Sequence, residues 1–146
     1  MIGVVIATHG GLAAEALACT ERIVGTLART RAVSVSSGEP LDAAREAIAA
    51  AIREVEEGDG VLVLTDMLGG TPANLALGFL SDRVEVVTGV NLPMLLKLST
   101  CRTQEARLPD VARLICAYGQ KNVTLASDLL RPRGEGGAVP GGGGAA

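Results

Sequence analysis

Four short runs rich in Val, Ile and Leu recur along the chain, and each is followed by a stretch with the apolar spacing of a helix. The runs occupy residues 2–8, 32–36, 61–65 and 84–88. Runs this short and this rich in β-branched residues are typical of strands buried on both faces of a parallel sheet. Because strands alternate with helices, we predict an α/β fold with a doubly wound, mainly parallel four-stranded sheet and right-handed crossovers.

The core of such a sheet must be built almost without aromatic side chains. The 146 residues include one Phe, one Tyr and no Trp, although 48% of them are hydrophobic. Val, Ile, Leu and Ala must therefore fill the space between the sheet and its helices. The length fits one domain, which we place at residues 1–130. The Gly-rich segment 131–146 is predicted to be a disordered tail, because it can bury little apolar surface.

Charge and cysteine usage argue against several classes of function. The formal net charge is −3, and the chain lacks the basic face and the stacking aromatic residues of a nucleic-acid-binding protein. The three cysteines form no CxxC pair and the sole histidine cannot complete a zinc site, so no metal and no cofactor are expected. No stretch has the features of a signal peptide or a membrane span, which favours a cytoplasmic protein that does not insert into the membrane.

Two polar residues follow the first and the third predicted strand. In an open parallel sheet, ligands bind at the carboxyl ends of the strands, at the point where the strand order reverses. If the order is 2-1-3-4, as in other doubly wound sheets, the strands at 2–8 and 61–65 are neighbours. His9, the only histidine, and Asp66 would then project into the same crevice although they lie far apart in the sequence.

A histidine beside a carboxylate suits phosphoryl transfer. One neutral ring nitrogen can attack phosphorus, while the other carries a proton whose hydrogen bond to a carboxylate fixes the tautomer. His9 is therefore the candidate nucleophile and Asp66 the candidate orienting residue. Backbone N–H groups at glycine-led helix starts and a threonine hydroxyl could bind the phosphoryl oxygens. These candidates are Gly10, Gly69, Gly70 and Thr71. We expect Thr71 to be a helix N-cap and Pro72 the first helical residue.

Other interpretations of these residues stay open at this level. A single histidine at a strand end is more often structural or simply exposed than catalytic, and an Asp before a Gly-Gly turn commonly caps the turn. Two enzyme classes are disfavoured, because the chain has neither the GxSxG motif of serine hydrolases nor the GxxxxGK[ST] phosphate-binding loop. No Arg precedes His9, as it does in histidine phosphatases. The convergence of His9, Asp66 and two glycine-led helix starts favours phosphoryl transfer.

Three blocks of the sequence together resemble the mannose-family IIA component of the bacterial phosphoenolpyruvate-dependent sugar phosphotransferase system. The blocks are IGVVIATHG at 2–10, VLVLTDMLGGTPAN at 61–74 and TGVNLPML at 88–95. The resemblance, which extends over residues 1–128, implies a phosphotransferase whose His9 accepts a phosphoryl group from the histidine-containing phosphocarrier protein. His9 would pass the group to a IIB component for sugar uptake and phosphorylation. Asp66 would hydrogen-bond the active-site histidine, and Thr71 stands where the family usually has Ser.

The same resemblance implies a homodimer in which a C-terminal strand is exchanged between subunits. Residues 122–126 form a possible fifth strand, antiparallel to the other four, and residues 123–126 could be the exchanged part. An apolar docking surface for the partner proteins is expected around the site. Its candidate residues are Met67, Leu68, Leu92, Pro93 and Met94. For the last three, core packing is an equally good interpretation.

Alternatives to a role in sugar uptake also stay open. The chain could be a regulatory phosphoacceptor in an incomplete phosphotransferase system. It could be the phosphocarrier subunit of dihydroxyacetone kinase, which has a similar fold and an N-terminal histidine but usually lacks the GG[ST]P-x-N block found at 69–74. A binding module of the same fold without phosphotransfer is a further candidate. The presence of both His9 and Asp66 disfavours such a module, because a degenerate relative would be expected to have lost one of them.

Overall fold

The computed structural model describes residues 1–131, and in these residues four strands form one sheet. The strands are β1 (Gly3–His9), β2 (Thr30–Val35), β3 (Val61–Thr65) and β4 (Val84–Thr88). All neighbours pair in parallel, and the order across the sheet is β2-β1-β3-β4. The predicted fold class and strand order are therefore confirmed.

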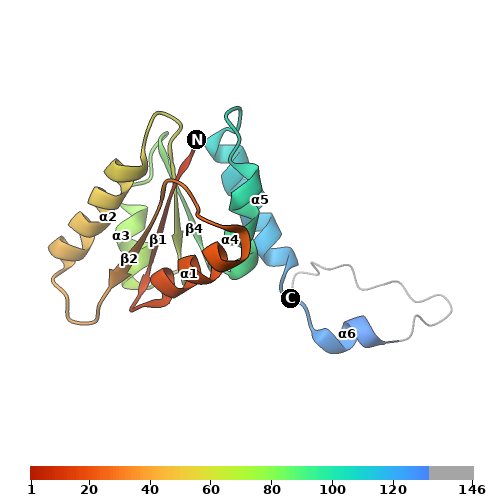
Figure 1. Cartoon of the computed structure of the whole chain (residues 1–146). Helices are drawn as coiled ribbons and strands as arrows, with labels where there is room; N and C mark the ends of the chain where they lie inside the picture. The colour runs from red at the N-terminus through yellow and green to blue at the C-terminus, as the bar shows by residue number, and fades with distance from the viewer. Residues whose placement is uncertain (132–146) are drawn as a thin grey trace.

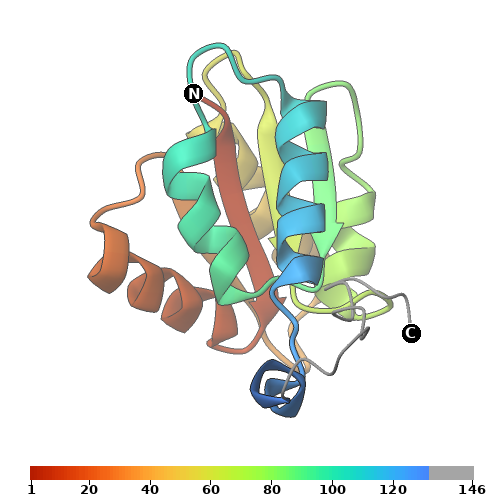
Figure 2. The same ribbon diagram turned by 90° about the vertical axis from the view of Figure 1, so that its right-hand side faces the viewer.

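Helices cover both faces of the sheet. They are α1 (Leu12–Val24), α2 (Leu41–Val55), α3 (Thr71–Leu77), α4 (Leu92–Cys101), α5 (Leu108–Lys121) and α6 (Ala126–Leu130). Helices α2 and α3 pack on one face, and α1, α4 and α5 pack on the other (Figures 1 and 2). None of the helices within residues 1–131 is long and apolar enough to cross a bilayer.

The core has two halves, because alternate side chains of a strand point to opposite faces. In β1, Val4 and Ile6 pack against the helices on the α1, α4 and α5 side, whereas Val5 and Ala7 pack on the α2 and α3 side. All four side chains are fully buried. Burial on both faces explains why the apolar run of this central strand is continuous.

The C-terminal segment differs from the sequence-based expectation. Residues 123–125 are in no strand, and the chain continues into α6, none of whose residues is buried. Helix α6 stands away from the sheet and its covering helices (Figure 1). The fifth strand predicted over 122–126 is thus absent from the sheet within residues 1–131. The tail predicted at 131–146 lies, except for Arg131, outside the described residues.

Candidate active site

His9 and Asp66 lie side by side at the carboxyl edge of the sheet. His9 is the last residue of β1, and Asp66 directly follows β3, the neighbouring strand. The distance from His9 Nδ1 to Asp66 Oδ2 is 2.7 Å, and the His9 backbone N–H donates to the same oxygen at 3.1 Å. The parallel pairing of β1 with β3 therefore brings together two residues that the sequence separates widely.

The Asp66 carboxylate orients the His9 ring. Partial burial alone would raise the pKa of Asp66, but hydrogen bonds from the His9 ring and the His9 backbone N–H outweigh it and hold this pKa below its usual value. Because an ionised carboxylate can only accept hydrogen bonds, Nδ1 of His9 carries the proton. In the neutral ring the free lone pair is then on Nε2, and the His9 side chain is 49% exposed.

Gly70 packs directly against the His9 ring. A Cβ at this position would lie 2.6 Å from Cε1 and 3.2 Å from Nε2 of His9, which is too close for the ring to stay in place. The preceding Gly69 has a φ of 86°, in the left-handed region that favours glycine. The Gly-Gly pair thus lets the loop after β3 turn tightly and pass against the edge of the ring.

Two of the predicted phosphoryl-binding residues differ from expectation. Gly70 is the N-cap of α3 and Thr71 is its first residue, so the prediction that Thr71 caps the helix is wrong. Thr71 is exposed and lines the same hollow as His9. The Gly10 N–H donates to the Val35 carbonyl at 3.2 Å. This N–H is therefore already used inside the protein, contrary to its predicted role as a phosphoryl donor.

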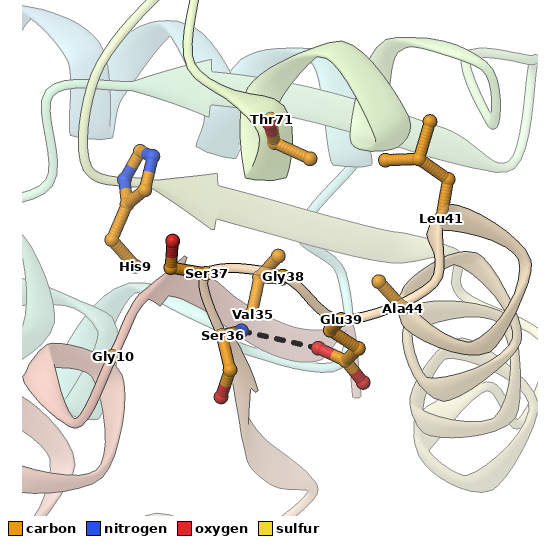
Figure 3. A pocket seen from close by; sticks show the side chains of 10 residues that line it. All are labelled: His9, Gly10, Val35, Ser36, Ser37, Gly38, Glu39, Leu41, Ala44 and Thr71. Carbon is orange, nitrogen blue, oxygen red and sulfur yellow. Dashed lines mark hydrogen bonds between the residues drawn. The ribbon is translucent and has the colours of Figure 1, made fainter.

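A hollow of about 530 Å³ opens beside His9 (Figure 3). Its walls come from the end of β1, the loop between β2 and α2, and the starts of α2 and α3. The lining residues are His9, Gly10, Val35, Ser36, Ser37, Gly38, Glu39, Leu41, Ala44 and Thr71. Ser34 Oγ donates to the Gly10 carbonyl at 2.6 Å, which ties β2 to the turn after His9. The sequence did not identify the loop at 36–39 as part of the site, because no motif or periodicity marks it.

The predicted docking residues separate into exposed and buried members. Exposed side chains near the site are those of Met67, Leu68 and Leu92. Pro93 is half-buried, and Met94 is only 3% exposed. Met94 packs so closely on α5 that a Cβ on Gly119 would lie 2.1 Å from its Cε. Met94 is therefore a core residue, and its predicted place in a docking surface is wrong.

No metal-binding cluster accompanies the site in the described part of the chain. Within residues 1–131, no group of three or more His, Cys, Asp or Glu side chains is placed to hold a metal ion. The groups that the structure does offer for chemistry at this edge are the His9 ring, the Asp66 carboxylate and the loop at 69–71.

A family model and two curated proteins each match most of this chain. A family model described as "PTS system fructose IIA component" matches residues 3–115. The chain is 32% identical over 132 residues to the PTS system fructose-specific EIIA component of Bacillus subtilis (strain 168), a match that covers 89% of this chain and 90% of that protein. It is 30% identical over 124 residues to the PTS system mannose-specific EIIAB component of Escherichia coli (strain K12), covering 84% of this chain and 38% of the longer protein.

The fold is also similar to a solved structure. The mannose/sorbose specific IIA subunit of the phosphotransferase system from Enterococcus faecalis matches with a TM-score of 0.76 at 31% identity. The match covers 85% of this chain and 93% of that one. Similarity in sequence and similarity in fold thus both extend over most of the chain.

Proposed function

This chain belongs to the mannose family of IIA components of the sugar phosphotransferase system, and we propose that it is a cytoplasmic carrier that accepts a phosphoryl group on His9. The donor is the histidine-containing phosphocarrier protein, and the acceptor is a IIB component that serves sugar uptake and phosphorylation. The observation that carries the proposal is the 2.7 Å contact between His9 Nδ1 and Asp66 Oδ2. It leaves Nε2 as the ring nitrogen that can attack phosphorus.

The transfer exchanges one phosphorus–nitrogen bond for another. Nε2 of neutral His9 attacks the phosphorus of the donor's phosphohistidine, and a bond forms between them. The bond from phosphorus to the donor nitrogen breaks, and its electron pair returns to the donor ring. The His9 ring gains positive charge in this step, which the Asp66 carboxylate stabilises through the Nδ1–H hydrogen bond. In transfer to the IIB component, His9 is in turn the leaving group.

The loop at 69–71 is the proposed binding element for the phosphoryl oxygens. The close packing of Gly70 on Cε1 and Nε2 of His9 supports this assignment, because it brings the loop backbone to the reacting edge of the ring. The first N–H groups of a helix have no partner within the helix, and α3 begins at Thr71. The Thr71 hydroxyl is a further candidate donor, since Thr71 is the first residue of α3 and lines the hollow beside His9.

Exposed apolar side chains form the proposed docking surface for the partner proteins. Its members are Met67, Leu68, Leu92 and Leu12, the last of which the sequence did not identify. Leu12 and Leu92 line a shared hollow of about 300 Å³, so these two side chains lie next to each other on this surface. Replacing Leu68, the most exposed of the four, with Asp should slow phosphorylation by the carrier without unfolding the domain. Unchanged transfer rates would remove Leu68 from this surface.

The C-terminal segment supports a homodimer as part of the proposal. It presents exposed apolar side chains, those of Val123, Leu125, Leu129 and Leu130. A soluble monomer rarely leaves so many apolar side chains exposed in one short segment, and a second subunit would bury them. Light scattering at micromolar concentration should give the mass of two chains, and a single-chain mass would contradict the dimer.

Radiolabelled phosphoryl transfer tests the proposed function. Phosphoenolpyruvate, enzyme I and the histidine-containing phosphocarrier protein are incubated with the wild-type chain or with His9→Ala. Wild type should acquire a label that is labile in acid and stable in alkali, and His9→Ala should acquire none, because phosphohistidine has this stability pattern and the chain has no other histidine. A folded wild-type chain that stays unlabelled, while carriers from several sources are labelled, would contradict the proposal.

A further inference from the structure

Asn91 stands between the proposed docking surface and helix α5. It directly precedes Leu92, one of the four apolar residues of that surface. It also lines the hollow of about 300 Å³ that Leu12 and Leu92 share, and its side chain is half-buried. Asn91 is therefore a polar residue at the edge of an apolar surface, in a place where it can control how that surface is shaped.

The Asn91 side chain uses both of its polar atoms inside the protein. Its Oδ1 accepts from the Met94 N–H at 3.2 Å, which makes Asn91 the N-cap of α4. Its Nδ2 donates to the Gly119 carbonyl at 3.0 Å, in the last turn of α5. Helices α4 and α5 lie side by side on the same face of the sheet (Figures 1 and 2). One side chain thus joins the start of α4 to the end of α5.

The bond to Gly119 is more than capping of α4 requires. Aspartate would cap the helix equally well, but it has no N–H to donate to a carbonyl. Serine would also cap it, but its hydroxyl lies one bond closer to its own backbone than Nδ2 of asparagine does. Of these capping residues, asparagine is the one that can hold α4 and reach α5 at the same time.

The loop before α4 is fixed to the site by its main chain. The Val90 N–H donates to the Thr65 carbonyl at 2.9 Å, and Thr65 directly precedes Asp66. The Asn91 side chain supplies the second attachment, on the side of α5. Met94 already packs on Gly119, so α4 and α5 stay together without the Asn91 bond. Loss of this bond should therefore leave the domain folded and loosen the loop that carries Leu92.

We propose that Asn91 is a positioning residue for partner recognition, which holds Leu92 beside Leu12 through its hydrogen bond to α5. A surface that keeps one conformation before binding loses less entropy when a partner docks, so this bond raises affinity without contacting the phosphoryl group. The inference rests on the proposed function, since it requires a carrier that docks at Leu12 and Leu92 in order to phosphorylate His9. It adds a residue that acts on partner affinity from outside the apolar surface.

The test measures how labelling of His9 depends on the concentration of the phosphorylated histidine-containing phosphocarrier protein. Asn91→Ser keeps an oxygen that can cap α4, removes the amide that reaches Gly119, and adds no charge. Asn122→Ser is the matched control. Asn122 Nδ2 also donates to a carbonyl in the last turn of α5, that of Tyr118 at 2.8 Å, but Asn122 is exposed and does not line the hollow.

Asn91→Ser should raise the carrier concentration that gives half the maximal rate about tenfold, because an ordered surface becomes mobile. The maximal rate should stay within about twofold of wild type, since the contact between His9 and Asp66 is unchanged. Asn122→Ser should change neither quantity more than about twofold. An unchanged half-saturating concentration in folded Asn91→Ser, or an equal rise in Asn122→Ser, would overturn the proposal. A fall in the maximal rate as large as the rise in the half-saturating concentration would also overturn it.

A second background separates positioning of Leu92 from a general loss of stability. In a chain that already carries Leu92→Ala, adding Asn91→Ser should raise the half-saturating concentration less than about threefold, because the side chain that Asn91 positions is gone. An equal rise in both backgrounds would show that Asn91 does not act through Leu92. If the serine variant does not fold, Asn91→Asp, which keeps the capping oxygen and lacks the donor, takes its place, with Asn122→Asp as its control.

Failure of the proposed function gives a different result. If phosphorylated carriers from several sources do not label the folded wild-type chain at any concentration, both proposals fall together. If wild type is labelled and Asn91→Ser shows the same dependence on carrier concentration, the phosphoacceptor role of His9 stands and only the positioning role of Asn91 is rejected.

Discussion

The two ends of the sheet are built in opposite ways. At the amino end, the buried Arg102 donates to the carbonyls of Ile2 and Leu98 at 2.9 and 3.2 Å, so this charged side chain is satisfied within the protein. At the carboxyl end, the Asp66 carboxylate binds one edge of the His9 ring, and the ring is half exposed beside an open hollow. At the amino end this charged group is engaged in internal hydrogen bonds, whereas the carboxyl end keeps a polar group available for reaction, as expected for the ligand-binding edge of a parallel sheet.

Two glycines show the same difference. A Cβ on Gly3, at the amino end, would lie 2.5 Å from the Val55 carbonyl oxygen, which belongs to the backbone of α2. A Cβ on Gly70, at the carboxyl end, would lie 2.6 Å from Cε1 of the His9 side chain. A packed backbone can move only by disturbing the core, but an exposed ring can turn aside. The same added methyl group should therefore damage stability at one end and activity at the other.

Asp66→Asn should have the largest effect on transfer. The amide lacks the negative charge that stabilises the ring, and it can donate as well as accept, so it no longer fixes the proton on Nδ1 of His9. We expect the rate of labelling by the phosphocarrier to fall about 10²- to 10³-fold. The control is Asp59→Asn at the amino end, which removes an exposed carboxylate paired with the N-terminus and should change the rate less than about twofold. If Asp66→Asn were labelled at the wild-type rate, the carboxyl end would not differ in function from the amino end.

Gly70→Ala should slow transfer about 10²-fold, because it displaces the His9 ring from the position that Asp66 holds. Gly70 has a φ of −80°, so alanine fits its backbone conformation without strain. The midpoint of thermal unfolding should therefore stay close to that of wild type. The labelling rate and the thermal midpoint are measured on the same sample. A normal labelling rate with a strongly lowered thermal midpoint would show that Gly70 serves stability rather than activity.

Gly3→Ala is the complementary substitution at the amino end. The new methyl group overlaps both the backbone and the side chain of Val55, so the free energy of unfolding should fall by about 2 to 3 kcal/mol. Transfer per folded molecule should be unchanged. Urea unfolding gives the stability, and the labelling rate is corrected for the folded fraction. A stable Gly3→Ala chain would show that the amino end is less tightly packed than the contacts indicate.

Acidification should have the smallest effect, and it is specific to the carboxyl end. The pKa of Asp66 is lower in the folded chain than in the unfolded chain, because hydrogen bonds from His9 outweigh its partial burial. The stability that ionised Asp66 adds to the folded chain is therefore complete above the ordinary carboxyl pKa of about 3.9. It is lost as the pH falls through the lower pKa that Asp66 has in the folded chain. Urea unfolding should show wild type more stable than Asp66→Asn at neutral pH, with the difference shrinking in acid. A difference that grows in acid would contradict the sign of this shift.

The sequence was sufficient for the features that depend on topology. The alternation of short apolar runs with helical stretches predicted a doubly wound parallel sheet, and the order 2-1-3-4, taken from other sheets of this kind, placed His9 next to Asp66. Neither result needs knowledge of loop geometry, because the carboxyl ends of neighbouring parallel strands always meet at one edge of a sheet.

Features that depend on loop conformation or tertiary packing could not be read from the sequence. Thr71 has the residue type of an N-cap, but the turn at Gly69 moves the helix start by one residue. Met94 follows the apolar block at Leu92, yet only its packing against Gly119 shows that it is buried. The role of Glu39 as part of the hollow depends on how its loop folds back toward β1, which no periodic pattern records.

The central claim is that Asp66 leaves Nε2 of His9 as the nucleophile, and nuclear magnetic resonance of the phosphorylated chain tests it most directly. The chain is labelled with ¹⁵N, phosphorylated by the carrier, and studied through the two-bond couplings between the ring protons and ring nitrogens of its sole histidine. We predict phosphorus on Nε2 and a proton on Nδ1. Phosphorus on Nδ1, or an unmodified ring in a folded chain exposed to phosphorylated carrier, would contradict the account.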